Sequence, residues 1–89
     1  MPKTIISDTS CFIVLTNIGE LDLLYKIYNH IITTPEVAME YGQSLPGWIE
    51  INAVTNKDLQ SALELQVDKG EASVIALAME IPYSTIISG

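Results

Sequence analysis

One segment near the start of the chain decides the fold: IISDTS, residues 5–10. The β-branched pair Ile5 and Ile6 favours a buried strand, and the strand pattern stops at the carboxylate of Asp8. Thr9 and Ser10, which follow, are residue types that cap helices. The segment therefore predicts a buried parallel strand that places an acid at the edge of a sheet, directly before a helix.

The size and composition of the chain favour one small globular domain. A chain of 89 residues buries only a little over roughly 60% of the surface that it exposes when unfolded. Hydrophobic residues make up 48% of it and the mean hydropathy is +0.32, which argues against disorder. We therefore expect a single domain over residues 1–89 with apolar surface left for another chain, and hence a homo-oligomer.

The charge and the single cysteine limit the possible partners and the compartment. Four Lys and no Arg stand against 11 acids, giving a net charge of −7, so nucleic acid needs the help of a cation to bind. Cys11 excludes an internal disulfide and is expected to be a buried, reduced thiol. No apolar run approaches the roughly 20 residues that span a bilayer, and Asp8 interrupts any signal-peptide core. We expect a cytoplasmic protein without membrane contact.

Short apolar strands alternate with helices along the chain. Strands are expected over 5–8, 31–33, 48–54 and 84–87, and helices over 11–18, 20–28, 35–41, 56–67 and 71–79. Because no hairpin signals separate the strands, the pattern predicts an α/β fold with a parallel sheet. The first helix is apolar on nearly all sides and is expected to be buried, with Thr9 or Ser10 as its cap. A covering helix normally follows the last strand of such a unit, so we interpret the chain as C-terminally truncated, with the last helix missing.

Three acids are expected to meet at one edge of this sheet. In a parallel sheet the carboxyl ends of the strands and the amino ends of the following helices share an edge. Asp8 closes the first strand, Glu40 lies on the helix after the second, and Glu71 lies in the first turn of the last helix. Carboxylates held together repel one another unless a cation is present, and oxygen ligands suit Mg²⁺ or Mn²⁺. The pattern favours metal-assisted phosphodiester hydrolysis.

Each acid also has a purely structural explanation. Asp8 could cap a helix, Glu71 could complement the dipole of its helix, and Glu40 is equally well a solvated helix residue. Glu36 follows Pro35 and is explained as a first-turn acid, so we set it aside as a ligand.

Other kinds of site have weaker support. His30 lacks the Cys or His neighbours of a zinc site, and no phosphate-binding glycine motif occurs. A phosphoacceptor built on Asp8 would need a second Asp two residues on, where Ser10 stands.

Three stretches of the sequence resemble those of a known family. They are DTS at 8–10, TPEV at 34–37 followed by Glu40, and KGEASVIALA at 69–78. With them the chain resembles a PIN domain, and is most similar to the short prokaryotic branch that carries a GEAxAIALA-type helix. The resemblance covers essentially the whole chain, and residues 70–78 are its most specific part.

The resemblance implies a fold, an activity and partners. PIN domains are three-layer α/β/α sandwiches around a parallel sheet and act as metal-dependent ribonucleases, often as the toxin of a toxin–antitoxin pair. By position, Asp8, Glu40 and Glu71 match the acids that hold Mg²⁺ or Mn²⁺, and Thr9 or Ser10 would orient a water beside the metal. RNA and an antitoxin protein are the implied partners.

One position departs from the family pattern. PIN domains usually carry a further Asp just after the strand that matches 84–87, and here Ser88 and Gly89 stand in its place. The alternative to a ribonuclease is therefore a non-catalytic, truncated PIN-fold module that acts in protein–protein interaction or oligomerisation.

Overall fold

The computed structural model describes residues 3–89, which form four strands and five helices. In chain order the elements are β1 (Thr4–Ser7), α1 (Thr9–Asn17), α2 (Asp22–Tyr28), β2 (Ile31–Thr33), α3 (Pro35–Tyr41), β3 (Ile49–Ile51), α4 (Lys57–Leu63), α5 (Lys69–Glu80) and β4 (Ser84–Ile87). All the predicted elements are present. β3 and α4 are shorter than the predicted 48–54 and 56–67.

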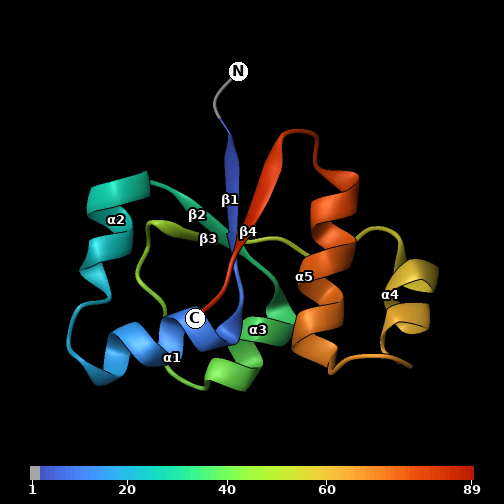
Figure 1. Ribbon diagram of the computed structural model, residues 1–89, viewed down its shortest axis with the longest axis horizontal. Coiled ribbons are helices and arrows are strands. Elements are labelled where there is room, and N and C mark those ends of the chain that lie inside the picture. The colour runs from blue at the N-terminus through green and yellow to red at the C-terminus, as the bar shows by residue number, and fades with distance from the viewer. Residues whose placement is uncertain (1–2) are drawn as a thin grey trace.

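The four strands form one parallel sheet in the order β3-β2-β1-β4. β1 lies in the interior of this sheet, paired with β2 through Ile6 and Ile32 and with β4 along its whole length. α1 and α2 lie on one side of the strands, and α5 with α4 lies on the other (Figure 1). The predicted α/β/α sandwich with a central parallel sheet is therefore confirmed.

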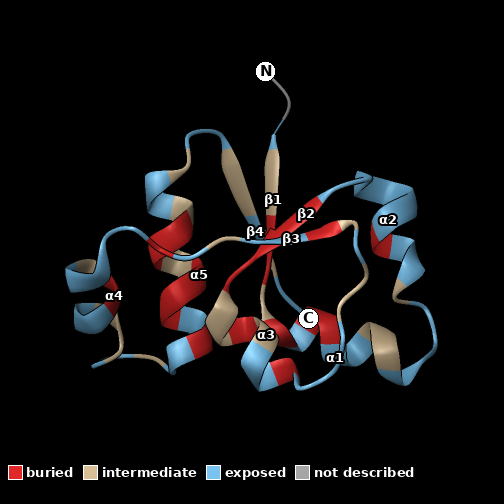
Figure 2. Ribbon diagram, turned by 180° about the vertical axis from the view of Figure 1, so that it is seen from behind, coloured by how far each residue is buried: buried red, intermediate tan, exposed pale blue. Residues whose placement is uncertain are grey.

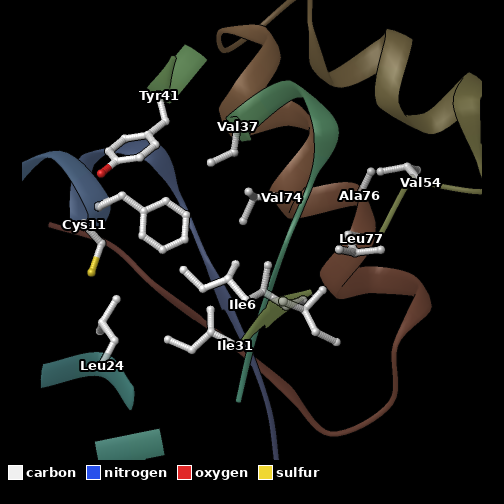
Figure 3. Packing of buried hydrophobic residues seen from close by; sticks show 13 residues of the cluster. Ile6, Cys11, Leu24, Ile31, Val37, Tyr41, Val54, Val74, Ala76 and Leu77 are labelled. Atoms are coloured by element: carbon white, nitrogen blue, oxygen red, sulfur yellow. The ribbon is translucent and has the colours of Figure 1, made fainter. Parts of the chain in front are cut away.

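The core lies where β1 and β2 meet the inner faces of α1, α3 and α5. Ile6, Phe12, Ile31, Val37 and Val74 are almost completely buried, and the buried segments gather in the middle of the molecule (Figure 2). Their side chains pack into one continuous cluster (Figure 3). This cluster fixes α1, α3 and α5 against the sheet, and the same three helices supply the acids described below.

α1 is less buried than its composition predicts. Ile13, Val14 and Ile18 are 42%, 50% and 64% exposed, whereas burial in this helix is confined to Thr9, Cys11 and Phe12. The helix packs only through one side, toward the sheet and α3, and no described element covers its outer face. The prediction of a helix buried on all sides was wrong, because apolar composition does not show how many sides of a helix have neighbours.

The second helix, α2, is also largely exposed. Leu24 is its buried residue, while Tyr25 and Tyr28 are exposed. Tyr25 instead packs against Trp48, with ring centroids 5.4 Å apart. This contact ties α2 to the loop before β3, and it gives Trp48 the anchoring role that its position in that loop indicates.

Helix caps explain where most helices begin. Thr34 accepts a hydrogen bond from the Val37 backbone N–H at 3.1 Å, and Gly42 ends α3 with φ of 75°, so this helix has the predicted bounds of 35–41. The cap of α1 is Asp8 and not Thr9 or Ser10, since both of these already lie inside the helix. α5 begins two residues earlier than expected, because Asp68 caps it.

The longest helix, α5, has 12 residues. Within residues 3–89 no helix has the length and apolar character needed to cross a membrane.

A matched pair of substitutions tests the one-sided packing of α1. Ile6→Ala removes a side chain with no exposed surface and should lower the free energy of unfolding by about 2–5 kcal/mol. Ile13→Ala, on the outer face of α1, should change it by no more than about 0.5 kcal/mol. Urea unfolding of both variants measures the difference. Equal losses would mean that the outer face of α1 is covered in the folded protein.

Candidate active site

The predicted acids meet in one small pocket at the carboxyl edge of the sheet. The pocket has a volume of about 60 Å³, and its lining residues are Asp8, Thr9, Ser10, Glu40, Asp68 and Glu71. They come from the start of α1, the end of α3 and the start of α5. The predicted convergence of Asp8, Glu40 and Glu71 beside Thr9 and Ser10 is thus present, and Asp68 adds a fourth carboxylate.

Asp8 occupies the junction between β1 and α1. Its Oδ1 accepts a hydrogen bond from the Cys11 backbone N–H at 3.0 Å and caps the helix. Its own N–H donates to the carbonyl oxygen of Ile87 at 3.2 Å. The capping explanation of Asp8 is therefore correct for one carboxylate oxygen, while Oδ2 makes no hydrogen bond within the described chain and remains available to a ligand.

Glu40 is held in position by contacts with two other elements. Its Oε1 accepts a hydrogen bond from the hydroxyl of Thr9, which is itself buried. It also lies against Gly70 so closely that a Cβ at that position would stand 2.8 Å from Oε1. A freely solvated helix residue would make neither contact, so the structure gives the Glu40 carboxylate a definite place beside Asp8.

Asp68 and Glu71 together form the start of α5. Asp68 Oδ1 accepts a hydrogen bond from the Glu71 backbone N–H at 2.8 Å, and the Glu71 side chain makes no hydrogen bond within residues 3–89. Asp68 was not predicted as a site residue, because residues 68–70 were expected to separate the helices over 56–67 and 71–79. An Asp followed three residues later by Glu is the spacing of a capping box, and that spacing would have identified it.

None of the four carboxylates forms an ion pair within residues 3–89. The described residues contain one ion pair within 4.0 Å, between His30 and Glu50 at 3.2 Å, and it lies outside the pocket. Carboxylates gathered without a cation repel one another. The pocket is therefore a concentration of negative charge in a chain that is already strongly acidic.

The pocket residues have the right chemistry for a divalent cation, but in this structure their side chains lie too far apart to share one ion. Carboxylate oxygens are the ligands that Mg²⁺ and Mn²⁺ prefer, and Asp8, Glu40 and Asp68 each direct only one oxygen to a protein donor. In their present positions, however, no three acidic, His or Cys side chains among residues 3–89 lie close enough to hold one ion together. Shared coordination therefore requires these side chains to turn toward the centre of the pocket.

The position of the further Asp that PIN domains usually carry after the last strand, where this chain has Ser88 and Gly89, lies at the same edge of the sheet. Ile87 pairs with Ser7 across β1 and β4, so the next residue, Ser88, follows the strand alongside Asp8. A Cβ on Gly89 would stand 2.8 Å from the carbonyl oxygen of Ser10. The geometry thus puts these two residues where the sequence pattern places the acid, but they carry no carboxylate, and neither lines the pocket.

Two residues outside the pocket have structural roles. Glu36, set aside as a ligand, accepts a hydrogen bond from the side-chain amide of Gln60 at 2.5 Å. Cys11 is buried, and this burial, reinforced by the negative charge of Asp8, raises the pKa of its thiol despite a hydrogen bond with Ser7. A thiol with a raised pKa is a poor nucleophile at neutral pH, so Cys11 is not a catalytic candidate.

Substitution of Gly70 separates the placement of Glu40 from the stability of the fold. In Gly70→Ala the new Cβ displaces the Glu40 carboxylate, which is the mobile end of its side chain, while Ala favours the helix by up to about 1 kcal/mol over Gly. We expect unchanged or slightly higher thermal stability and an affinity for Mn²⁺ that is weaker by about 10-fold or more, measured by titration calorimetry.

The matched control is Gly47→Ala, because a Cβ on Gly47 meets nothing within 4 Å. It should leave the Mn²⁺ affinity unchanged. If Gly70→Ala binds Mn²⁺ as tightly as the wild type, the contact between Glu40 and Gly70 does not shape the site.

Comparison with known proteins agrees with the fold. The model of the family described as DUF3368, PIN domain, matches residues 4–89. Searches of curated proteins and of solved structures found no match. The family match spans every strand and helix of the sandwich and all four pocket acids, and the chain therefore belongs to the PIN-domain family.

Proposed function

We propose that this PIN domain is an endoribonuclease that uses Mg²⁺ or Mn²⁺ bound by Asp8, Glu40 and Glu71. The observation that carries the proposal is the pocket itself, where carboxylates from the start of α1, from α3 and from the start of α5 line one small space and form no ion pair within the described residues. Their mutual repulsion is relieved when a divalent ion binds. Membership of the PIN family supports the same chemistry.

When bound, the ion supplies Lewis acidity, because it neutralises charge on the phosphate and lowers the pKa of water. The protein's own residues prepare the place for it. The backbone of Asp8 is held in place by the hydrogen bond from its N–H to Ile87, and its Oδ1 accepts the N-cap hydrogen bond from Cys11, which leaves Oδ2 without a partner in the described chain. The Thr9 hydroxyl donates a hydrogen bond to Glu40 and so orients that carboxylate. Thr9 is a positioning residue in this scheme.

Ser10 and Asp68 have supporting roles in the proposal. Ser10 is exposed at the pocket, and its hydroxyl can hydrogen-bond a water or a phosphate oxygen there. Asp68 keeps Glu71 in the first turn of α5 through its cap. The net charge of −7 makes RNA binding dependent on the cation, since the pocket without it repels phosphate.

We propose that the protein acts in the cell as the toxin of a toxin–antitoxin pair. An antitoxin protein or a second copy of the chain would bind the apolar outer face of α1. Ile13, Val14 and Ile18 supply that face. The same observation, with Ser88 and Gly89 in place of the fourth acid, favours a second candidate. That candidate is a non-catalytic PIN-fold module that works through protein–protein contacts.

Isosteric substitutions test the metal site. Asp8→Asn keeps the N-cap, because Asn caps as well as Asp, and Glu40→Gln keeps an acceptor for Thr9, yet each removes one charge. In the wild type, Mn²⁺ at 100 times its Kd should raise the free energy of unfolding by about 2.7 kcal/mol. Both variants should lose most of this gain and should cleave single-stranded RNA about 100-fold more slowly or worse.

Asp58→Asn, on an exposed acid of α4, is the control and should behave as the wild type does. Cleavage that survives in Asp8→Asn, together with a stability that Mn²⁺ leaves unchanged, would exclude the proposed site. A wild type that forms a defined oligomer in light scattering but neither binds Mn²⁺ nor cuts RNA would establish the non-catalytic candidate instead.

A further inference from the structure

We propose that a groove beside the acid pocket, between α3 and the start of α5, binds the nucleotide next to the scissile phosphate. This inference rests on the proposed function. The groove consists of two overlapping cavities of about 240 and 340 Å³. We call it the α3–α5 groove, and its lining residues are Pro35, Glu36, Met39, Glu40, Glu64, Lys69 and Gly70.

The α3–α5 groove adjoins the acid pocket. Glu40 lines both spaces, and it lies directly against the backbone of Gly70, which has no side chain to widen the boundary between them. The Glu40 side chain therefore forms the boundary between the two cavities. A strand whose phosphate lies in the pocket reaches the groove with its next nucleotide, without passing over another helix.

Lys69 is the one basic residue that lines the groove, whose other charged residues are Glu36, Glu40 and Glu64. The chain contains four Lys, and among the described cavities only the α3–α5 groove both includes a Lys and shares a wall with the acid pocket. Lys3 lines a cavity at the other end of β1. Lys69 is exposed and makes no ion pair within the described chain. Its ammonium is thus available to a phosphate, which Lys binds as a point charge.

Met39 and Pro35 give the groove an apolar wall. Met39 is 83% exposed, so most of its side chain is accessible to a ligand in the groove. A thioether side chain adapts to flat, polarisable partners, and the face of a nucleobase is such a partner. Met39 is adjacent to Glu40 in sequence, so a base on Met39 lies one residue from the proposed metal ligand.

The acids of the groove limit how much RNA it accepts. Glu36 accepts a hydrogen bond from Gln60, whereas Glu64 lines only the cavity that does not include Glu40. A second phosphate beside Glu64 would be repelled. The groove therefore suits one nucleotide of a single strand, with its phosphate on Lys69 and its base on Met39, and a duplex would not present a separated base to it.

The test measures the binding of a fluorescein-labelled, single-stranded RNA octamer of mixed sequence by fluorescence anisotropy over a range of salt concentrations. Ca²⁺ is present in place of Mn²⁺, because it takes the same oxygen ligands. Lys69→Gln should weaken binding about 5- to 10-fold. It should also make the dependence of log K on log salt shallower by about 0.7, the value for one phosphate contact on a single strand. Met39→Ala should weaken binding about 5-fold and leave the salt dependence unchanged.

Lys57→Gln, on the exposed surface of α4, is the matched control and should change neither quantity. If Lys69→Gln keeps the wild-type affinity and salt dependence, or if the wild type binds no RNA in the presence of the cation, the inference is overturned. If the variants behave as expected but the wild type fails to cleave RNA in Mn²⁺, the groove is established and the proposed catalytic function fails.

Discussion

The contact between the Glu40 carboxylate, the Thr9 hydroxyl and the bare backbone of Gly70 is the point on which the candidate site depends. It joins α3, α1 and α5, three helices that are far apart in sequence. The contact requires a residue without Cβ at position 70, since any side chain there would occupy the place of the carboxylate. Because the core cluster of Ile6, Phe12, Val37 and Val74 already holds these helices against the sheet, the acids meet without any further structure.

The parallel sheet makes this convergence possible. When β1 and its neighbours run in the same direction, every strand ends at one edge, and the helices that follow begin there. That edge gathers the amino ends of α1 and α5 with their capping acids, Asp8 and Asp68. Each of these carboxylates caps a helix through one oxygen and lines the pocket. The structural role of each acid therefore does not exclude ligand binding, because a carboxylate has two oxygens.

Much of the fold and part of the site could be predicted from the sequence. The buried strand before Asp8, the cap and stop of α3 at Thr34 and Gly42, and the last strand all follow from local patterns of residue type. The three predicted acids line one pocket for the same reason, because a parallel sheet has a single carboxyl edge. The exposure of Ile13 and Tyr25 could not be predicted, since it depends on which neighbours each helix side finds. Asp68 was missed because its capping spacing was read as a helix break.

The sequence by itself determined the order of strands and helices, the net negative charge and the acids available to a metal. Only the tertiary structure decided which carboxylate oxygens are occupied by the fold and that Gly70 makes room for Glu40. It likewise decided that Lys69 and Met39 border a groove beside the acids. The physical reason is that residue periodicity and capping act over a few neighbouring residues, whereas these positions are about 30 residues apart in the chain, with 31 between Thr9 and Glu40. Their distances depend on the packing of the whole core.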